Sequence, residues 1–154
     1  MARNPTIDNT FLLADFVPFR LNRLADAVSQ DLSEIYRDRF GLDIPEWRVL
    51  VTVGQRSGCN AQHVAASTRM HKTRVSRAVA SLTKRKLVER ISCAEDGREF
   101  RLRLTKPGLR VYEVLVPLAL ERERALLAKM SAVNSRGFIA ALSQLEDALG
   151  LNET

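Results

Sequence analysis

Residues 60–90 constrain the fold of this chain more than any other stretch. They read as two short helices joined by a tight turn and followed by a strand. In the second helix Val75, Ala78, Val79 and Leu82 recur at helical spacing, which predicts one buried face. The helix start and the other face carry basic and hydroxyl-bearing side chains: Lys72, Thr73, Arg74, Ser76, Arg77 and Lys84. This combination is typical of a helix that reads the DNA major groove, and a solvated basic face on an ordinary helix is the alternative.

Beyond Leu87 the pattern changes from helical to alternating. Phe100, Leu102 and Leu104 alternate with two arginines, as expected of a strand with one buried and one charged face. Residues 87–93 are a plausible partner strand. The sequence therefore predicts a winged helix, which is a helix-turn-helix followed by a β-hairpin.

The predicted tip of this hairpin carries one arginine. It has the sequence Ala-Glu-Asp-Gly-Arg at residues 94–98, with a glycine suited to a tight turn. Arg98 could enter the minor groove, where the negative potential attracts arginine. We expect Asp96 to hold that guanidinium in place and not to touch DNA itself.

Residues 47–108 resemble the MarR family of bacterial winged-helix regulators. The resemblance rests on Val75-Ser76-Arg77, on Leu87-Val88-Glu89-Arg90, and on Asp96-Gly97-Arg98 followed by Leu102-Arg103-Leu104-Thr105 and Gly108. Helical flanks extend the likeness over nearly the whole chain. Lys86 departs from the pattern because the family often has glycine there, so any turn with positive φ must accommodate a lysine.

The predicted fold class is therefore mainly α with a small β-hairpin wing. We interpret residues 1–154 as one domain, in which the DNA-binding lobe spans residues 45–106 and dimerising helices occupy residues 1–44 and 107–154. Terminal helices that are apolar on more than one face suit an isologous homodimer on a palindromic operator, as the resemblance also implies. The alternative is that these helices pack back on their own monomer.

Helix boundaries follow from capping residues. Asp15 is the expected N-cap of the first long helix, which would place Pro18 at its third position, and Gly41 is its expected stop. Pro45 is expected in the first turn of the second helix, and Asn60, Thr105 and Ser131 are the expected N-caps of later helices. A bend or an interruption is predicted at Pro117.

Composition limits the alternatives. The 154 residues carry a net charge of +6, which suits a polyanionic partner. No apolar run reaches membrane-spanning length, and the start lacks a signal pattern, so we expect a soluble, cytoplasmic protein without a membrane partner. Cys59 and Cys93 form no motif and are expected to be free thiols.

Signals for chemistry are scarce. His63 and His71 have no cysteine or carboxylate at metal-ligand spacing, so neither a metal nor a cofactor is expected. Cys59 with His63 is a weak nucleophile pair that lacks an orienting partner, so the protein is not expected to be an enzyme. Two alternatives to ligand sensing stay open: a redox-sensing regulator that uses Cys93, and an architectural DNA-binding protein without an effector.

We expect specific DNA contacts and, less directly, an effector cleft. The expected DNA-binding residues are Asn60, His71, Lys72, Thr73, Arg74, Ser76, Arg77, Asp96 and Arg98. The resemblance places an effector between the lobe and the dimerising helices, where the candidate residues are Phe16, Phe19, Arg20, Arg23, Trp47 and Arg48. Aromatic walls with a cation suit an aromatic carboxylate or its thioester.

The effector can be named more narrowly from a second likeness. Residues 44–50 and 70–77 resemble the branch of the family that regulates hydroxycinnamate catabolism. This likeness implies a repressor that is released by an aromatic acyl-CoA ester such as p-coumaroyl- or feruloyl-CoA.

Overall fold

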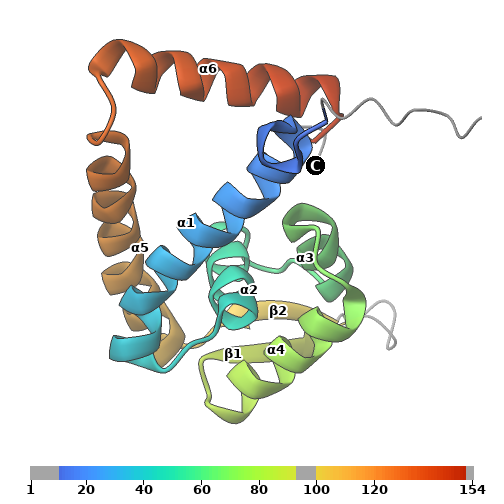
Figure 1. The fold of residues 1–154 in the computed structure, drawn as a ribbon. Coiled ribbons are helices and arrows are strands. Elements are labelled where there is room, and N and C mark those ends of the chain that lie inside the picture. Colours follow the sequence, from blue (N-terminus) through green and yellow to red (C-terminus); the bar gives the residue numbers. More distant parts are fainter. Residues whose placement is uncertain (1–10, 93–99, 152–154) are drawn as a thin grey trace, which may run out of the picture.

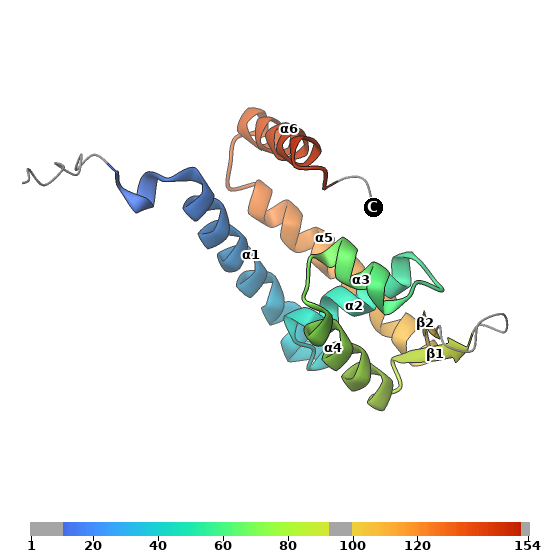
Figure 2. The same cartoon turned by 90° about the vertical axis from the view of Figure 1, so that its right-hand side faces the viewer.

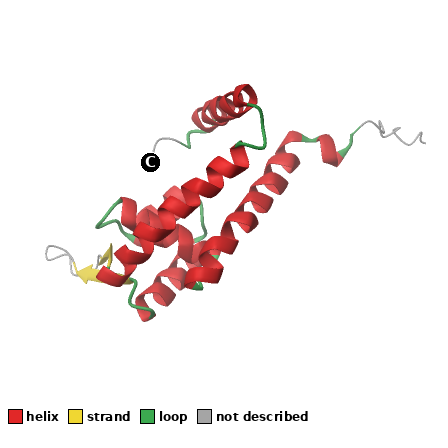
Figure 3. Cartoon of the chain, turned by 90° about the vertical axis from the view of Figure 1, so that its left-hand side faces the viewer, coloured by secondary structure: helices red, strands yellow, loops and turns green. Residues whose placement is uncertain are grey.

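The computed structural model describes residues 11–92 and 100–151. They form a mainly helical fold with a two-stranded antiparallel hairpin, which confirms the predicted fold class (Figure 3). None of the described helices is long and apolar enough to cross a membrane. In chain order the elements are η1 (Leu13–Asp15), α1 (Val17–Phe40), α2 (Ile44–Gln55), α3 (Ala61–Thr68), α4 (Lys72–Lys84), β1 (Val88–Ser92), β2 (Phe100–Leu104), α5 (Lys106–Leu127) and α6 (Ala132–Ala148).

The helices divide the molecule into two parts. We call α2, α3, α4 and the hairpin the lobe, and α1, α5 and α6 the frame. Helices α2, α3 and α4 gather with the hairpin at one end (Figure 1). The long helices α1 and α5 pack against each other and run away from this lobe, and α6 lies across their far end (Figures 1 and 2). The first and last helices are thus held away from the hairpin.

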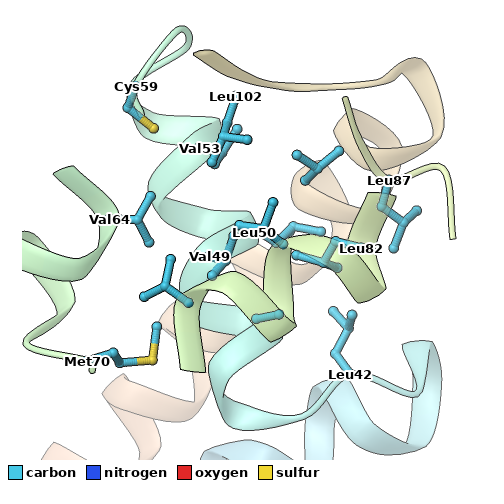
Figure 4. Close-up of a cluster of buried hydrophobic side chains, with 14 of the residues drawn as sticks. Leu42, Val49, Leu50, Val53, Cys59, Val64, Met70, Leu82, Leu87 and Leu102 are labelled. Carbon is cyan, nitrogen blue, oxygen red and sulfur yellow. The ribbon is translucent and has the colours of Figure 1, made fainter. Parts of the chain in front are cut away.

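The core lies inside the lobe. Leu50 and Val53 of α2 meet Val64 of α3, Leu82 of α4 and Leu102 of β2 in one buried cluster (Figure 4). The four apolar residues predicted to form the inner face of α4 are all buried, which confirms the helical spacing.

Local capping chemistry sets most helix starts. The side chains of Asn60, Thr105 and Ser131 each accept a bond from the backbone N–H three residues later, as predicted. Helix α2 starts with a capping box, in which Asp43 and Glu46 accept each other's backbone N–H at 2.8 and 2.9 Å.

The predicted cap of α1 is wrong. Asp15 lies in the 3-10 turn η1, and Phe16 is the residue before the helix, with an extended backbone and no side-chain cap. Helix α1 therefore begins at Val17, and Pro18 occupies the first turn one position earlier than expected. Its missing N–H still costs little there, because N–H groups of a first turn have no partner within the helix.

Residues with positive φ follow helices α1, α3 and α4, and Arg69 at the end of α3 has φ 55°. Gly41 ends α1 with φ 59°, as the Phe40-Gly41 stop predicted. Lys86 follows α4 and also has φ 59°. The turn with positive φ that was considered at this position is therefore present, and a lysine makes it.

The hairpin pairs Val88 with Leu104 and Ser92 with Phe100. A third segment joins it, which the sequence did not predict. The N–H of Leu102 donates to the carbonyl of Cys59 at 2.7 Å, and the N–H of Gly58 donates to the carbonyl of Leu102 at 3.0 Å. This bridge attaches the start of the helix-turn-helix to the wing.

Helices α5 and α6 leave much apolar surface exposed. Helix α5 continues through Pro117, so the interruption considered there does not occur. Helix α6 makes few contacts with the other helices, and none of its side chains is buried. The side chain of Val133 is 70% exposed and that of Leu149 is 66% exposed.

Candidate DNA interface and effector cavity

Helix α4 presents a basic face to solvent. Its apolar face holds it in the lobe, so the residues between the buried positions point outward. The five residues of α4 predicted to bind DNA are all exposed: Lys72, Thr73, Arg74, Ser76 and Arg77. Among the described residues, no acidic side chain forms an ion pair with the three cations in this set. Their charges therefore remain available to a polyanion.

The other two predicted contacts in the helix-turn-helix are helix caps. Asn60 accepts the N–H of His63 at 2.8 Å, and the Nδ1 atom of His71 accepts the N–H of Thr73 at 3.2 Å. His71 thus fixes the first turn of α4. Asp96 and Arg98 lie outside the described residues.

Sequence reasoning missed a groove of about 520 Å³ between α3, α4 and the hairpin. The groove is lined by Lys72 and Ser76 of α4 and by Arg90 and Phe100 of the hairpin, among others. The alternating pattern predicts which residues lie on the inner face of the hairpin. It does not predict how close the hairpin lies to α4. Two cations and a hydroxyl that line one groove suit a nucleic-acid phosphate.

A second, largely apolar cavity of about 560 Å³ lies among α1, α2, α5 and α6. Its walls include Leu24, Trp47, Val116 and Leu120. The Trp47 ring stacks on Tyr36 with 5.3 Å between centroids and 9° between planes. Trp47 is therefore held rigidly at the wall of a space large enough for an aromatic group.

The charged group in this cavity is one that the sequence did not reveal. Arg122 of α5 donates to Asp31 of α1 at 2.7 and 2.8 Å and to Glu34 at 3.2 Å. The hydrogen bonds from Arg122 hold the pKa of Asp31 below its ordinary value of 3.8, and the same pair raises the pKa of Arg122. These partners lie 91 residues apart, so no local pattern pairs them.

The six predicted effector residues do not gather in one place. Trp47 lines the cavity, whereas Arg20 and Arg23 line an adjoining groove of about 400 Å³ that shares three wall residues with it. Phe19 lies beneath Arg23, whose guanidinium carbon is 5.7 Å from the ring centroid. Phe16 packs against Phe11, which precedes η1, and Phe16, Phe19 and Arg48 line neither space.

The described residues hold no obvious catalytic or metal centre. No group of three or more His, Cys, Asp or Glu side chains among them could hold a metal ion. Cys59 is a buried free thiol beside Val53 and Leu102, and burial raises its pKa (Figure 4). A thiol that stays protonated is a poor nucleophile and a poor redox sensor. Cys93 lies outside the described residues.

Comparison with known proteins finds a family model and several solved structures that this chain resembles. Residues 40–99 match the model of the MarR family. A MarR/EmrR family transcriptional regulator from Acinetobacter sp. ADP1 has 27% sequence identity and a TM-score of 0.80, over 91% of this chain and 99% of that one. A MarR family regulator from Silicibacter pomeroyi DSS-3 has the same identity and TM-score over 90% and 98%.

A third structure is similar in fold. BpsR of Bordetella bronchiseptica, whose DNA binding is regulated by 6-hydroxynicotinic acid, has 19% identity and a TM-score of 0.78, over 89% of this chain and 97% of that one. No curated protein sequence matches the chain.

Proposed function

We propose that this chain, a winged-helix transcriptional regulator of the MarR family, is a repressor that binds a palindromic operator as a homodimer and is released by a small aromatic effector. One observation supports DNA binding above all. The exposed face of α4 carries cations without acidic partners among the described residues, over a fully buried opposite face.

Different residues of the proposed interface would contact different parts of the DNA. Thr73 and Arg77 would meet base edges or adjacent phosphates, and Lys72 and Arg74 would act mainly on phosphates. In the wing, Arg98 would enter the minor groove with Asp96 as its partner. Ser76 of α4 and Arg90 of β1 both line the groove beside α4 and would hold the DNA backbone between helix and hairpin.

The homodimer is supported by the surface of the terminal helices. The N-terminal half of α1 and most of α6 expose large apolar side chains, although these helices belong to an otherwise well-packed chain. We assign dimerisation to residues 1–44 and 107–154 and DNA binding to residues 45–106. Two lobes related by a two-fold axis would place two copies of α4 in successive major grooves.

For the effector, the cavity favours an uncharged aromatic acyl group over a free aromatic acid. A ligand carboxylate at this site would need a free cation, and Arg122 is already held by Asp31 and Glu34. Glu123 also lines the cavity and would repel an anion. In a thioester the acyl group is neutral, so p-coumaroyl- or feruloyl-CoA fits this charge pattern better than the corresponding acid. BpsR, which has the same fold, responds to an aromatic acid, so the two classes must be tested against each other.

The test uses Trp47, the only tryptophan of the chain, as a probe inside the cavity. We would titrate the protein with p-coumarate, ferulate and their CoA thioesters, with acetyl-CoA as the control for the carrier. Trp47 fluorescence and the melting temperature should respond to the aromatic thioesters, because a ligand that binds only the folded state stabilises it. A protein that binds operator but responds to none of these compounds would be an effector-independent DNA-binding protein.

A further inference from the structure

The three residues after α4 are bonded to both long helices of the frame. Arg85, Lys86 and Leu87 form the turn between the end of α4 and the start of β1, and Lys86 supplies its positive φ. The turn is therefore both the end of the recognition helix and a point of contact with α1 and α5.

Arg85 makes the contact with α1. Its guanidinium donates to the carbonyl of Phe40 and, at 3.1 Å, to the carbonyl of Gly41, at the C-terminus of α1. The same guanidinium lies 3.7 Å from the buried carboxylate of Glu46, which also accepts a hydrogen bond from Ser81 of α4. The last turn of α4 is thus tied to the end of α1 and the start of α2 at once.

Thr105, the N-cap of α5, and Gly108, in the first turn of α5, make the contact between α5 and the turn. The Thr105 hydroxyl donates to the carbonyl of Lys86 at 2.6 Å, and its N–H donates to the carbonyl of Leu87 at 3.1 Å. A Cβ atom on Gly108 would lie 1.9 Å from that Leu87 oxygen, so α5 begins in direct contact with the turn. No larger residue fits at position 108 without moving the backbone.

We propose that residues 85–87 are the joint through which the dimerising helices fix the direction of the recognition helix, with Arg85 as its main positioning residue. This inference rests on the proposed function as a DNA-binding dimer. Helix α2 also packs on α1 and α5, and its Trp47 ring stacks on Tyr36 of α1. The joint adds directional hydrogen bonds to α4 itself. Because α4 has 13 residues and spans roughly 20 Å, a small rotation at its C-terminal end displaces the base-reading residues at its start.

The experiment measures how strictly the dimer requires the distance between operator half-sites. The probes are a duplex that the parent protein selects from a random pool, and the same duplex with one base pair added between its half-sites. The parent should bind the selected duplex far better, since two-fold readers require fixed spacing. Arg85→Gln should lose about 5-fold or more of this discrimination while remaining a folded dimer, and Arg85→Lys should lose less, because lysine keeps the charge without the forked geometry.

Two variants separate positioning from stability. Cys59→Ser places a hydroxyl group in the buried core of the lobe, away from the joint, so the melting temperature should fall with discrimination unchanged. Arg103→Gln breaks an exposed ion pair with Glu89 in the same lobe and should leave discrimination unchanged. The inference is overturned if Arg85→Gln discriminates like the parent, or if discrimination simply follows melting temperature across the set. A parent that selects no duplex overturns the proposed function as well.

Discussion

At the scale of single residues, the contacts at the start of α5 show how little freedom the joint has. Gly108 touches the backbone carbonyl of Leu87, whereas Gly137, in the middle of α6, has no atom within 4 Å of the position of a Cβ. Both glycines lie inside helices, where alanine is intrinsically preferred. Their surroundings, and not their helical propensity, therefore decide what substitution does.

Gly108→Ala should destabilise the protein strongly, because the added methyl group overlaps a backbone oxygen that is held by Thr105. We expect a loss on the order of 1–3 kcal/mol in the free energy of unfolding, measured by urea denaturation. Gly137→Ala is the matched control and should gain up to about 1 kcal/mol. Equal effects of the two substitutions would contradict the close approach of α5 to the turn.

Arg77 is exposed on α4, so its loss should affect DNA binding and not folding. Arg77→Ala should weaken specific operator binding by about 1–3 kcal/mol, with little change in binding to random DNA. Arg124→Ala removes an exposed arginine from the distant half of α5 and serves as the control. Competition titrations against both DNAs would measure the difference, and an Arg77→Ala protein with parental specificity would remove this residue from base reading.

In the wing, Arg98→Ala should weaken operator binding at near-physiological salt, and Asp96→Ala should do so more mildly by freeing the arginine. Folding should survive both changes if the tip is exposed as the hairpin pattern predicts. Unchanged affinity in Arg98→Ala would exclude the wing from the interface.

At the scale of elements, one ion pair joins α1 to α5 along the frame. Arg122 binds Asp31 through two hydrogen bonds, and both groups are partly exposed to solvent. Because the pair lies at the wall of the cavity, it links the packing of two helices to the charge that a ligand would meet. The pKa of Asp31 is lower in the folded protein, so the pair stabilises the fold only while this carboxyl is ionised.

This pair gives a dependence of stability on pH. Above the ordinary aspartate pKa of 3.8 its contribution is complete, and it is lost as the pH falls from there through the lower pKa of the folded state. Asp31→Asn should therefore be less stable than the parent at pH 6, and the difference should shrink as the pH falls below 3.8. Thermal unfolding of both proteins across this range would test the sign. A difference that stays constant would show that Asp31 is not stabilised by ionisation.

The elements also show what the sequence could predict. Asn60, Thr105 and Ser131 were predictable because a cap depends on chemistry within one helical turn. Phe16 was not, because no capping side chain marks the start of α1 and the preceding 3-10 turn decides it. The bridge from Cys59 to the wing depends on tertiary packing, which periodicity does not encode.

The candidate site divides in the same way. The exposed face of α4 follows from the spacing of four buried residues and was predicted residue by residue. The cavity was predicted only through Trp47, since the cation that lines it comes from α5, far along the chain. Arg20 and Arg23 were chosen for their nearness in sequence to two phenylalanines, and the structure places them in the adjoining groove.

At the scale of the whole molecule, the lobe buries most of its apolar side chains, whereas the frame exposes many of them. The core residues cluster among α2, α3, α4 and the hairpin, while large apolar side chains along α1 and α6 face solvent. A single chain gains nothing from these exposed faces, but a second copy would cover them. The same helices also form the cavity, so the proposed dimer contact and the proposed effector site would share their walls.

The dimer is tested by placing charge on the exposed apolar faces. Val17 is 59% exposed and Val133 is 70% exposed, so Val17→Glu with Val133→Glu should cost an isolated chain little stability. In a dimer that buries these faces, the charges should shift the protein to monomers and weaken operator binding. Analytical ultracentrifugation would measure the assembly state. A double variant that remains a parental dimer would move the interface elsewhere.

The last prediction joins the two sites through the dimer. If an effector in the cavity favours an arrangement of the frame in which the two copies of α4 miss their half-sites, then effector and operator must weaken each other's binding by the same factor. Couplings of this kind are typically about 1–3 kcal/mol, or roughly 5- to 150-fold. Trp47 fluorescence gives effector affinity with and without operator, and a DNA titration gives the reverse.

Arg20→Ala separates effector binding from this coupling. Arg20 lines the groove beside the cavity and is remote from α4, so it could hold the anionic carrier of a thioester whose acyl group lies against Trp47. The variant should keep parental operator affinity without effector and should need more effector for release. If it releases at the parental concentration, Arg20 is not an effector ligand. If it binds no operator even without effector, it belongs to the dimer contact, because the frame and not the ligand then sets the distance between the recognition helices.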